Sequence, residues 1–326
     1  MEPVIKVDRL VKRYHKGEEN AVDDISFEVN AGEFFAFLGP NGAGKTTTIS
    51  ILTTILSKTE GTVTIVGHDV EREAKQVREC IGILFQNHSV DLELTFEENI
   101  RLHVSLYGIY GYRPFYRLMP TEYKQRIESL AEMMGIHDSL FKKLKTFSGG
   151  MKRKVEIVRS LMHQPRVLFL DEPTQGLDAS SRRSFWEHMQ KVRREENVTL
   201  FLTTHYLAEA EDADTVCMIH RGKIAMSGSP NEMKRILMLE RSMELDADDR
   251  CALKSELSEF KVEFMEISNG FKVKYQQQTP QLLLSQINTP LTKLNVMQPT
   301  LEEAYMHLMV RKDKEGEQNV DSGKGA

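Results

Sequence analysis

The chain has 326 residues, of which 40% are hydrophobic and 28% charged, and its formal net charge is −5. This composition predicts a globular protein, and the negative charge disfavours a broad nucleic-acid-binding surface. We expect neither a membrane-spanning helix nor a signal peptide, because no apolar run approaches about 18 residues and no apolar core follows a basic start. Cys80, Cys217 and Cys251 lie far apart, which predicts neither disulfides nor a metal site and favours a reducing cytoplasm.

Two kinds of strand pattern occur along the first 220 residues. Residues 5–8, 25–29 and 61–67 alternate apolar and polar side chains, as half-exposed antiparallel strands do. Continuous apolar runs, which suit a parallel sheet covered on both faces, occupy residues 34–38, 81–85, 167–170, 198–202 and 215–219. Helical stretches separate most of these runs, so the sequence predicts an α/β core of right-handed β-α-β units.

Residues 39–47 read Gly-Pro-Asn-Gly-Ala-Gly-Lys-Thr-Thr between an apolar strand and a helical stretch. The spacing fits the phosphate-binding pattern Gly-x4-Gly-Lys-Ser/Thr. In such a loop, backbone N–H groups and the helix N-terminus face phosphate oxygens, the lysine reaches the β and γ phosphates, and the threonine hydroxyl reaches Mg²⁺. The residues expected to bind ATP here are Gly39, Asn41, Gly42, Gly44, Lys45, Thr46 and Thr47.

Residues 95–145 carry helix formers and few strand signals, which predicts a helical insertion from about residue 95 to residue 160. Within it, residues 107–116 are rich in aromatic side chains, including Tyr110, Tyr112, Phe115 and Tyr116. So many aromatic side chains are unusual in a solvated loop and suggest a binding surface. Packing within the insertion is the alternative.

Residues 146–151 read Thr-Phe-Ser-Gly-Gly-Met before a helical stretch. Ser148 is a candidate N-cap, and Gly149 and Gly150 would leave N–H groups open to an anion. The residues alone leave capping and phosphate binding equally open. The apolar run 167–170 is followed by Asp171 and Glu172, which predicts a Mg²⁺-linked carboxylate and a water-activating one at a strand end.

In order and spacing, these motifs resemble those of ATP-binding-cassette (ABC) ATPases over residues 3–235. The resemblance implies that Tyr14 stacks on adenine, that Gln86 joins Mg²⁺ and relays its state to the helical insertion, and that His205 contacts the γ phosphate. It also implies that residues 176–178, which end in Asp178, cross a dimer interface and that Ser148–Gly150 close on the partner's ATP. The usual signature, Leu-Ser-Gly-Gly-Gln, is altered here by Phe147 and Met151.

The family fold implied is a P-loop NTPase core with a parallel sheet, an antiparallel β subdomain and the helical insertion, over residues 1–238. Residues 239–310 predict a small α+β domain with the order β-α-β-β-α-β, a hairpin turn at Asn269-Gly270 and a last helix capped by Thr300 and Glu303. Residues 298–308 are similar to the ending of daunorubicin-resistance-type export cassettes. Residues 311–326 are polar and are expected to be disordered.

The resemblance implies a subunit at the cytoplasmic face of the membrane that pairs with a second copy or a related cassette. It would bind ATP and Mg²⁺ and power a separate permease that exports a drug, lipid or polysaccharide. The alternative is a non-transport ABC ATPase of the translation or DNA-repair type. A second cassette, a basic linker or sustained heptads would favour that alternative, and the sequence has none of these.

Overall fold

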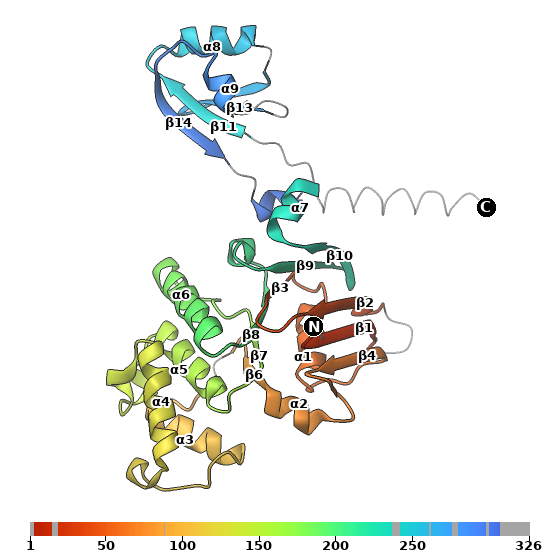
Figure 1. Ribbon diagram of the computed structural model, residues 1–326, viewed down its shortest axis with the longest axis vertical. Helices are drawn as coiled ribbons and strands as arrows, with labels where there is room; N and C mark the ends of the chain where they lie inside the picture. The colour runs from red at the N-terminus through yellow and green to blue at the C-terminus, as the bar shows by residue number, and fades with distance from the viewer. Residues whose placement is uncertain are drawn as a thin grey trace, which may run out of the picture. The chain divides into compact units, whose positions relative to one another are not determined.

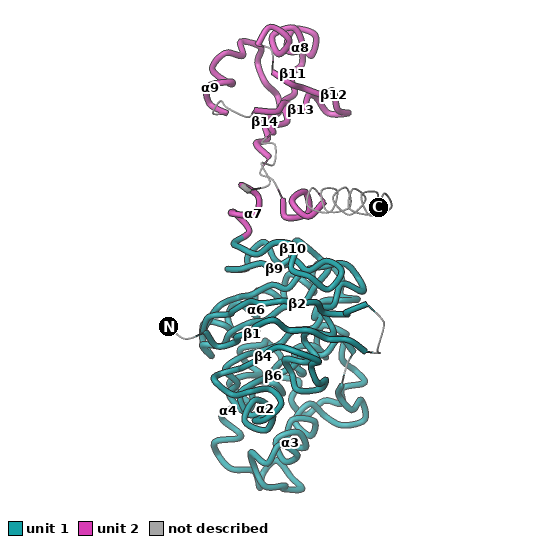
Figure 2. Tube along the Cα trace, turned by 90° about the vertical axis from the view of Figure 1, so that its right-hand side faces the viewer, with its two compact units in different colours: residues 1–229 teal, residues 230–326 magenta. Residues whose placement is uncertain are grey.

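A computed structural model of the chain describes residues 3–14, 19–87, 89–236, 242–260, 262–275, 280–297 and 300–306. The chain divides into two compact units, residues 1–229 and 230–326, which Figure 2 draws in different colours. The predicted boundary at residue 238 and the predicted tail 311–326 lie outside the described residues, as do residues 307–310 of the expected last helix. Within the described ranges, no helix is long and apolar enough to cross a membrane.

An antiparallel sheet with the order β2-β1-β4-β5 opens the first unit. Its strands are β1 (Ile5–Lys12), β2 (Val22–Val29), β4 (Glu60–Ile65) and β5 (His68–Asp69). Buried and exposed residues alternate along most of β2, which confirms the predicted half-exposed strands. The ring of Phe27 stacks on Phe35 of the second sheet at 5.4 Å, so the two sheets share one apolar core.

The second sheet has the order β10-β9-β3-β8-β7-β6. Its strands are β3 (Phe34–Leu38), β6 (Ile81–Leu84), β7 (Val167–Asp171), β8 (Thr199–Thr204), β9 (Thr215–His220) and β10 (Lys223–Gly228). All neighbours run parallel except β10, which pairs antiparallel with β9. Every residue of β3, β7 and β8 is buried. The carboxyl ends of these three strands lie side by side and position the candidate site (Figure 1).

Helices cover this sheet and build the insertion. They are α1 (Lys45–Leu52), α2 (Ala74–Cys80), α3 (Phe96–Leu106), α4 (Thr121–Met133), α5 (Gly149–Leu161) and α6 (Ala179–Glu195). Single 3-10 turns are η1 (Tyr116–Leu118), η2 (His137–Ser139), η3 (Leu144–Thr146) and η4 (Leu207–Ala210). A capping box of Thr95 and Glu98 starts α3, and α3, α4 and α5 pack together (Figure 1). The buried Tyr123 of α4 donates to the Glu97 carboxylate at 3.0 Å, which ties α4 to α3.

The aromatic stretch of the insertion divides into two pairs. The ring of Tyr110 lies edge-on to Tyr123 at 5.7 Å, and the Tyr116 hydroxyl donates to Glu128 at 2.7 Å. Tyr112 and Phe115 are 64% and 57% exposed. Packing within the insertion therefore accounts for the first pair, and the second pair is open to solvent.

The second unit contains a four-stranded antiparallel sheet with the order β12-β13-β11-β14. Its elements are α7 (Pro230–Ile236), β11 (Ser242–Ala247), α8 (Arg250–Glu259), β12 (Phe264–Ile267), β13 (Gly270–Lys274), α9 (Pro280–Leu284) and β14 (Leu291–Met297). From β11 to β14 the order is the expected β-α-β-β-α-β. The capping box also forms, since Thr300 and Glu303 exchange hydrogen bonds of 3.1 and 3.2 Å. Together the two units confirm the predicted fold class.

Candidate active site

The phosphate loop joins the end of β3 to the start of α1. Gly44 is the N-cap of α1 and has a φ of 109°, which side chains rarely adopt. A Cβ atom at Gly44 would lie 2.5 Å from the Ala21 carbonyl oxygen, and one at Gly39 would lie 2.4 Å from that of Ile219. Glycine is therefore needed at both ends of the loop. Between and after them, Asn41, Gly42 and Thr46 are exposed at the helix N-terminus.

Lys45, the first residue of α1, is only 5% exposed. Its Nζ donates to the carbonyl oxygens of Gly39 at 2.7 Å and Pro40 at 3.1 Å, and it lies 4.0 Å from Oε1 of Glu172. Burial lowers the pKa of Lys45, and the negative charges of Glu172 and Asp171 act in the opposite direction. The ammonium group is thus held beside the loop by neutral carbonyls, where a phosphate oxygen would be a stronger acceptor.

Asp171 closes β7 and is buried. It accepts a hydrogen bond of 2.5 Å from the Thr203 hydroxyl of the neighbouring strand β8. Burial raises the pKa of Asp171, the Thr203 hydrogen bond lowers it, and the charge of Glu172 raises it further. A buried carboxylate whose ionised form is unfavourable in the folded chain is well suited to receive a cation.

Glu172 follows with a φ of 45°, a left-handed conformation that is uncommon outside glycine and is often found at functional sites. Its N–H donates to the Thr203 carbonyl at 2.9 Å, which fixes the turn after β7. Its Oε1 lies 3.2 Å from Nδ1 of His205, although the geometry is not that of a hydrogen bond. Lys45, Glu172 and His205, predicted from three distant segments, therefore meet at one point.

Tyr14 lies beside Thr47, which belongs to the first turn of α1. The Tyr14 hydroxyl is 3.1 Å from the Thr47 hydroxyl, and Nζ of Lys12 is 5.5 Å from the centre of the Tyr14 ring. Tyr14 is 53% exposed, so its ring is open to a planar ligand.

Ser148 and Asp178 each cap a helix. Ser148 accepts from the Met151 N–H at 3.3 Å at the start of α5, and Asp178 accepts from the Ser181 N–H at 3.0 Å at the start of α6. Hydrogen bonds from Ser181 hold the pKa of Asp178 below its usual range. In the described part of the chain, no hydrogen bond or ion pair joins either residue to the phosphate loop. Phe147, one of the two signature replacements, is a buried core residue.

Gln86 lies two residues beyond β6, and its side chain is exposed. Its amide donates to Oε1 of Gln175 at 2.7 Å. Across the residues that the structure describes, no hydrogen bond joins Gln86 to Thr46 or Asp171.

Similarity to other proteins identifies the family of this chain. Residues 22–175 match the family described as "ABC transporter". Nod factor export ATP-binding protein I of Paraburkholderia xenovorans (strain LB400) is 34% identical over 268 residues, which cover 82% of this chain and 84% of that protein. The chain belongs to the ATP-binding proteins of ABC transporters.

Other members of the ABC family and their structures agree with this assignment. The daunorubicin/doxorubicin resistance ATP-binding protein DrrA of Streptomyces peucetius is 38% identical over 72% of this chain and 67% of its own length. YbhF of Escherichia coli (strain K12), a probable multidrug ABC transporter ATP-binding protein, is 35% identical over 233 residues, but this chain spans only 38% of it. A solved ATP-binding subunit of an ABC transporter is 29% identical with a TM-score of 0.61, over 72% of this chain and 92% of that one.

The sequence did not predict Glu209, a buried acid that joins two loops of this ABC-transporter ATP-binding protein. Glu209 accepts hydrogen bonds from the hydroxyls of Thr174 and Thr204, the latter at 2.7 Å. Thr174 lies two residues after Glu172, and Thr204 directly precedes His205. The network therefore holds the loops that carry the acid and the histidine. Its only sequence signal was an acid four residues after His205.

The available donors fit a nucleotide-bound Mg²⁺. The Asp171 carboxylate and the exposed Thr46 hydroxyl offer the oxygen ligands that Mg²⁺ prefers. Among the described residues, no group of three or more His, Cys, Asp and Glu could hold a metal alone. This composition is expected where phosphate oxygens and water complete the coordination.

Proposed function

We propose that this chain binds and hydrolyses ATP to power an exporter. The observation that carries the proposal is the position of Glu172, whose Oε1 lies 4.0 Å from Lys45 Nζ and 3.2 Å from His205 Nδ1. In the roles proposed, Lys45 binds the β and γ phosphates, Glu172 orients and polarises the attacking water, and His205 contacts the γ phosphate. Among the described residues, the buried Nδ1 of His205 has no hydrogen-bond partner, which leaves it available for such a contact.

The remaining residues would position the nucleotide. Tyr14 would stack on adenine, and the exposed loop residues Asn41 and Gly42, with Gly39, Gly44 and Thr47, would surround the phosphates. Thr46, Gln86 and Asp171 would hold Mg²⁺, the last of them directly or through water. When bound, Mg²⁺ would neutralise negative charge that develops on the transferred phosphoryl group.

A second cassette would complete the site. Ser148, Gly149, Gly150 and Asp178 lie at exposed helix N-termini that no described contact joins to the chain's own phosphate loop. We therefore propose that they close on ATP held by a partner, which is a second copy or a related cassette. A solved ATP-binding cassette bound to ADP and Pi, 25% identical with a TM-score of 0.59, is dimeric and supports this arrangement.

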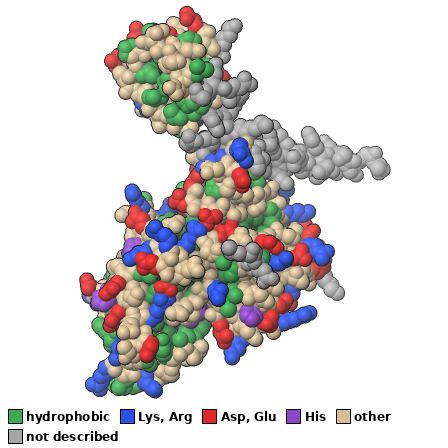
Figure 3. Space-filling model, in the orientation of Figure 1, with side chains coloured by type: hydrophobic (Ala, Val, Ile, Leu, Met, Phe, Trp, Pro, Cys, Tyr) green, Lys and Arg blue, Asp and Glu red, His purple; other side chains and the backbone are tan. Residues whose placement is uncertain are grey.

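The names of the relatives support export. They describe drug resistance and Nod factor export, so we propose a drug, lipid or polysaccharide as cargo, a separate membrane permease, and a position at the cytoplasmic face of the membrane. A cavity of about 250 Å³ beside β6, lined in part by Phe85, His103 and Tyr107, is a candidate contact for the permease. On the face drawn in Figure 3, acidic and basic side chains are interspersed, and such a face does not form the basic patch that a nucleic-acid partner would need.

Lys45→Ala tests the proposal. The change removes the charged side chain of the phosphate loop and leaves the glycine geometry intact, so ATP affinity and hydrolysis should both collapse while the circular dichroism spectrum is kept. Calorimetric titration with ATP measures the affinity. Parent-like ATP affinity in the variant would contradict the assignment of the loop.

A further inference from the structure

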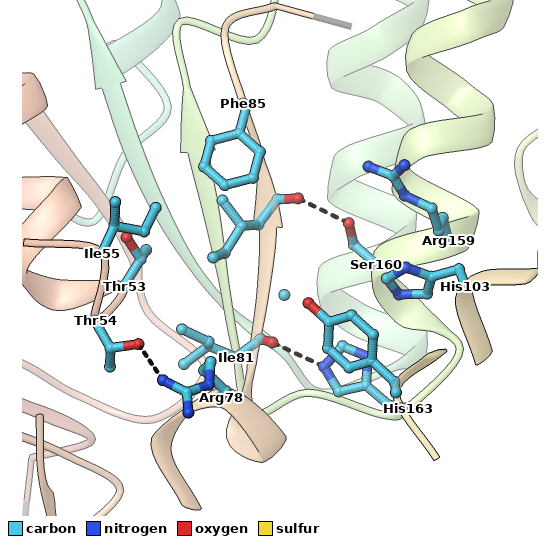
Figure 4. Close-up of a pocket in the computed structure, with 13 residues that line it drawn as sticks. Thr53, Thr54, Ile55, Arg78, Ile81, Phe85, His103, Arg159, Ser160 and His163 are labelled. Atoms are coloured by element: carbon cyan, nitrogen blue, oxygen red, sulfur yellow. Dashed lines mark hydrogen bonds between the residues drawn. The ribbon is translucent and has the colours of Figure 1, made fainter. Parts of the chain in front are cut away.

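Helix α5 holds the outer edge of the parallel sheet through its side chains. Strand β6 is the edge strand, so the carbonyl groups on its outer side lack a partner strand. The Ser160 hydroxyl donates to the Ile83 carbonyl at 3.0 Å, and Nε2 of His163 lies 2.8 Å from the Ile81 carbonyl oxygen (Figure 4). Side chains of α5 and of His163, which follows the helix, thus replace the missing strand along β6.

The same helix continues this pairing past the end of the strand. Nη1 of Arg153 donates to the Phe85 carbonyl at 2.6 Å, and Nη2 donates to the Gln86 carbonyl. One turn later, the Glu156 carboxylate accepts from the Ser89 N–H at 2.7 Å. The backbone that carries Gln86 is therefore fixed on both sides of that residue by α5.

Arg153 is the centre of this arrangement. It is 2% exposed, and its Nη1 also lies 3.1 Å from Oε2 of Glu156, which is 1% exposed. The planar guanidinium donates to two successive carbonyls and a carboxylate from two separate nitrogen atoms in a fixed geometry, whereas the three donors of a lysine ammonium share one nitrogen and form no such fork. The charge is satisfied within the protein, so the bonds to residues 85 and 86 are strong and persistent.

Arg153 lies in the second turn of the helix that starts at Gly149 and is capped by Ser148. A helix moves as a unit over such a distance, so a displacement of Ser148 carries Arg153 and the Gln86 backbone with it. The residue expected to sense this chain's own Mg²⁺–ATP and the residues expected to contact the partner's ATP are thus linked through one side chain.

We propose that Arg153 is a positioning residue that holds Gln86 for ATP hydrolysis, an inference that rests on the proposed function. Arg153 acts through Gln86 and touches no phosphate. It contributes to the rate only as long as the Gln86 side chain is present. A residue that merely stabilises the fold would lower activity equally in either background.

A double-mutant cycle separates the two roles. The variants of the full chain are Arg153→Lys, which keeps the charge beside Glu156 and loses the fork, Gln86→Ala, and the double variant. We expect Arg153→Lys to lower kcat by about tenfold in the parent, as a positioning effect can, and to change it by less than about twofold when Gln86 is absent. Equal fold losses in both backgrounds, or a parent-like kcat for Arg153→Lys, would overturn the proposal.

Arg126→Lys is the matched control. Arg126 also uses its fork to donate to a carboxylate and a carbonyl, those of Glu196 and Leu161, and it makes no hydrogen bond to the described residues 85–87 and 89. It should show the same fold loss, if any, with and without Gln86. Coupling of Arg126 to Gln86 as large as that of Arg153 would also overturn the proposal.

Amide hydrogen exchange tests the same contact without hydrolysis. Exchange in the segment 84–87 should accelerate in Arg153→Lys and stay unchanged in Arg126→Lys, and unchanged exchange in both variants would overturn the proposal. A parent chain that fails to hydrolyse ATP would contradict the proposed function instead, and the exchange result would still decide whether Arg153 holds the segment.

Discussion

At the scale of single residues, the ionised carboxylate of Asp171 destabilises the folded chain. Burial raises its pKa, so the ionised form is less favourable in the folded chain than in the unfolded one. By linkage, this destabilisation is absent below the unfolded pKa, near 3.8, and develops as the pH rises through the raised folded value. At neutral pH the unliganded protein bears the full cost, and a bound cation would offset it.

We predict that Asp171→Asn stabilises the unliganded protein at pH 7 and impairs Mg²⁺-dependent hydrolysis. The amide oxygen can still accept the Thr203 hydrogen bond, while the buried charge is lost. Urea unfolding from about pH 4 to pH 8 measures the free energy of unfolding, and the gain over the parent should grow as the pH rises from the unfolded pKa, near 3.8, to the raised folded pKa and then stay constant.

Asp178→Asn is the control with the opposite sign. Hydrogen bonds lower the pKa of Asp178, so its ionised form favours the folded state above the unfolded pKa. Asparagine is an equally good N-cap, which isolates the effect of charge. Destabilisation by Asp171→Asn at pH 7 would mean that attraction to Lys45 outweighs burial.

The sequence predicted candidate residues for the site but not the contacts that hold them. Lys45, Asp171 and Glu172 lie in motifs whose spacing follows from phosphate chemistry. The hydrogen bond from Thr203 to Asp171 joins residues 32 positions apart along the chain, and the one from Thr174 to Glu209 joins residues 35 apart. Only the bond from Thr204 to Glu209 is local. Such pairings depend on strand order, which a local pattern does not encode.

At the scale of elements, α5 has two functions in one helix. Its N-terminus presents Ser148 and Gly149 to solvent, and its body holds the edge of β6 through Ser160. The sequence left N-capping and phosphate binding by Ser148 equally open. The structure provides a cap, but at 3.3 Å the hydrogen bond is long, so capping alone is a weak reason for the serine.

We predict that Ser148→Ala and Ser148→Asn separate the two roles. Alanine should cost about 1 kcal/mol of stability through the lost cap, whereas asparagine should cost little. If Ser148 contacts the partner's γ phosphate, both variants should lose most of the ATPase activity. Thermal unfolding and a phosphate-release assay measure the two effects. Parent-like hydrolysis by Ser148→Asn would leave Ser148 as a cap alone.

Among elements, buried strands were predictable and marginal ones were not. Strands β3, β7 and β8 are continuous apolar runs because both of their faces are covered. Strand β10 escaped prediction because it is an edge strand of mixed polarity, none of whose residues is buried. The second helix of the predicted β-α-β-β-α-β order, α9, spans only Pro280–Leu284, and its ends could not be predicted because a local pattern fixes helix ends poorly.

At the scale of the whole molecule, every residue proposed to bind nucleotide lies within the first compact unit, residues 1–229. The second unit has its own apolar core, built around Leu245, Leu253 and Phe271. Nucleotide binding should therefore not require the second unit.

We predict that a chain ending at Leu239 keeps the ATP affinity of the full chain. Each compact unit buries its own apolar side chains, so the truncated chain should retain a cooperative unfolding transition. Circular dichroism checks the fold and calorimetry checks the affinity. A truncated chain that folds but binds no ATP would show that the second unit contributes to the nucleotide site.

Glu172 is the residue proposed to activate water for ATP hydrolysis between two cassettes. Glu172→Gln keeps the size of the side chain and its hydrogen bonding and removes the charge. Hydrolysis should slow by about 10²–10⁴-fold, the usual contribution of a general base or water-orienting group, while ATP binding through Lys45 persists. Because slow hydrolysis retains the γ phosphate, the closed dimer should accumulate.

The most direct measurement is the ATPase rate of Glu172→Gln, taken together with its elution in size-exclusion chromatography in ATP and in ADP. If Glu172 activates water, we expect hydrolysis at least about 10²-fold slower than in the parent, with a dimer in ATP and a monomer in ADP. Hydrolysis at the parent rate would contradict it and would make His205 the leading candidate for the catalytic group.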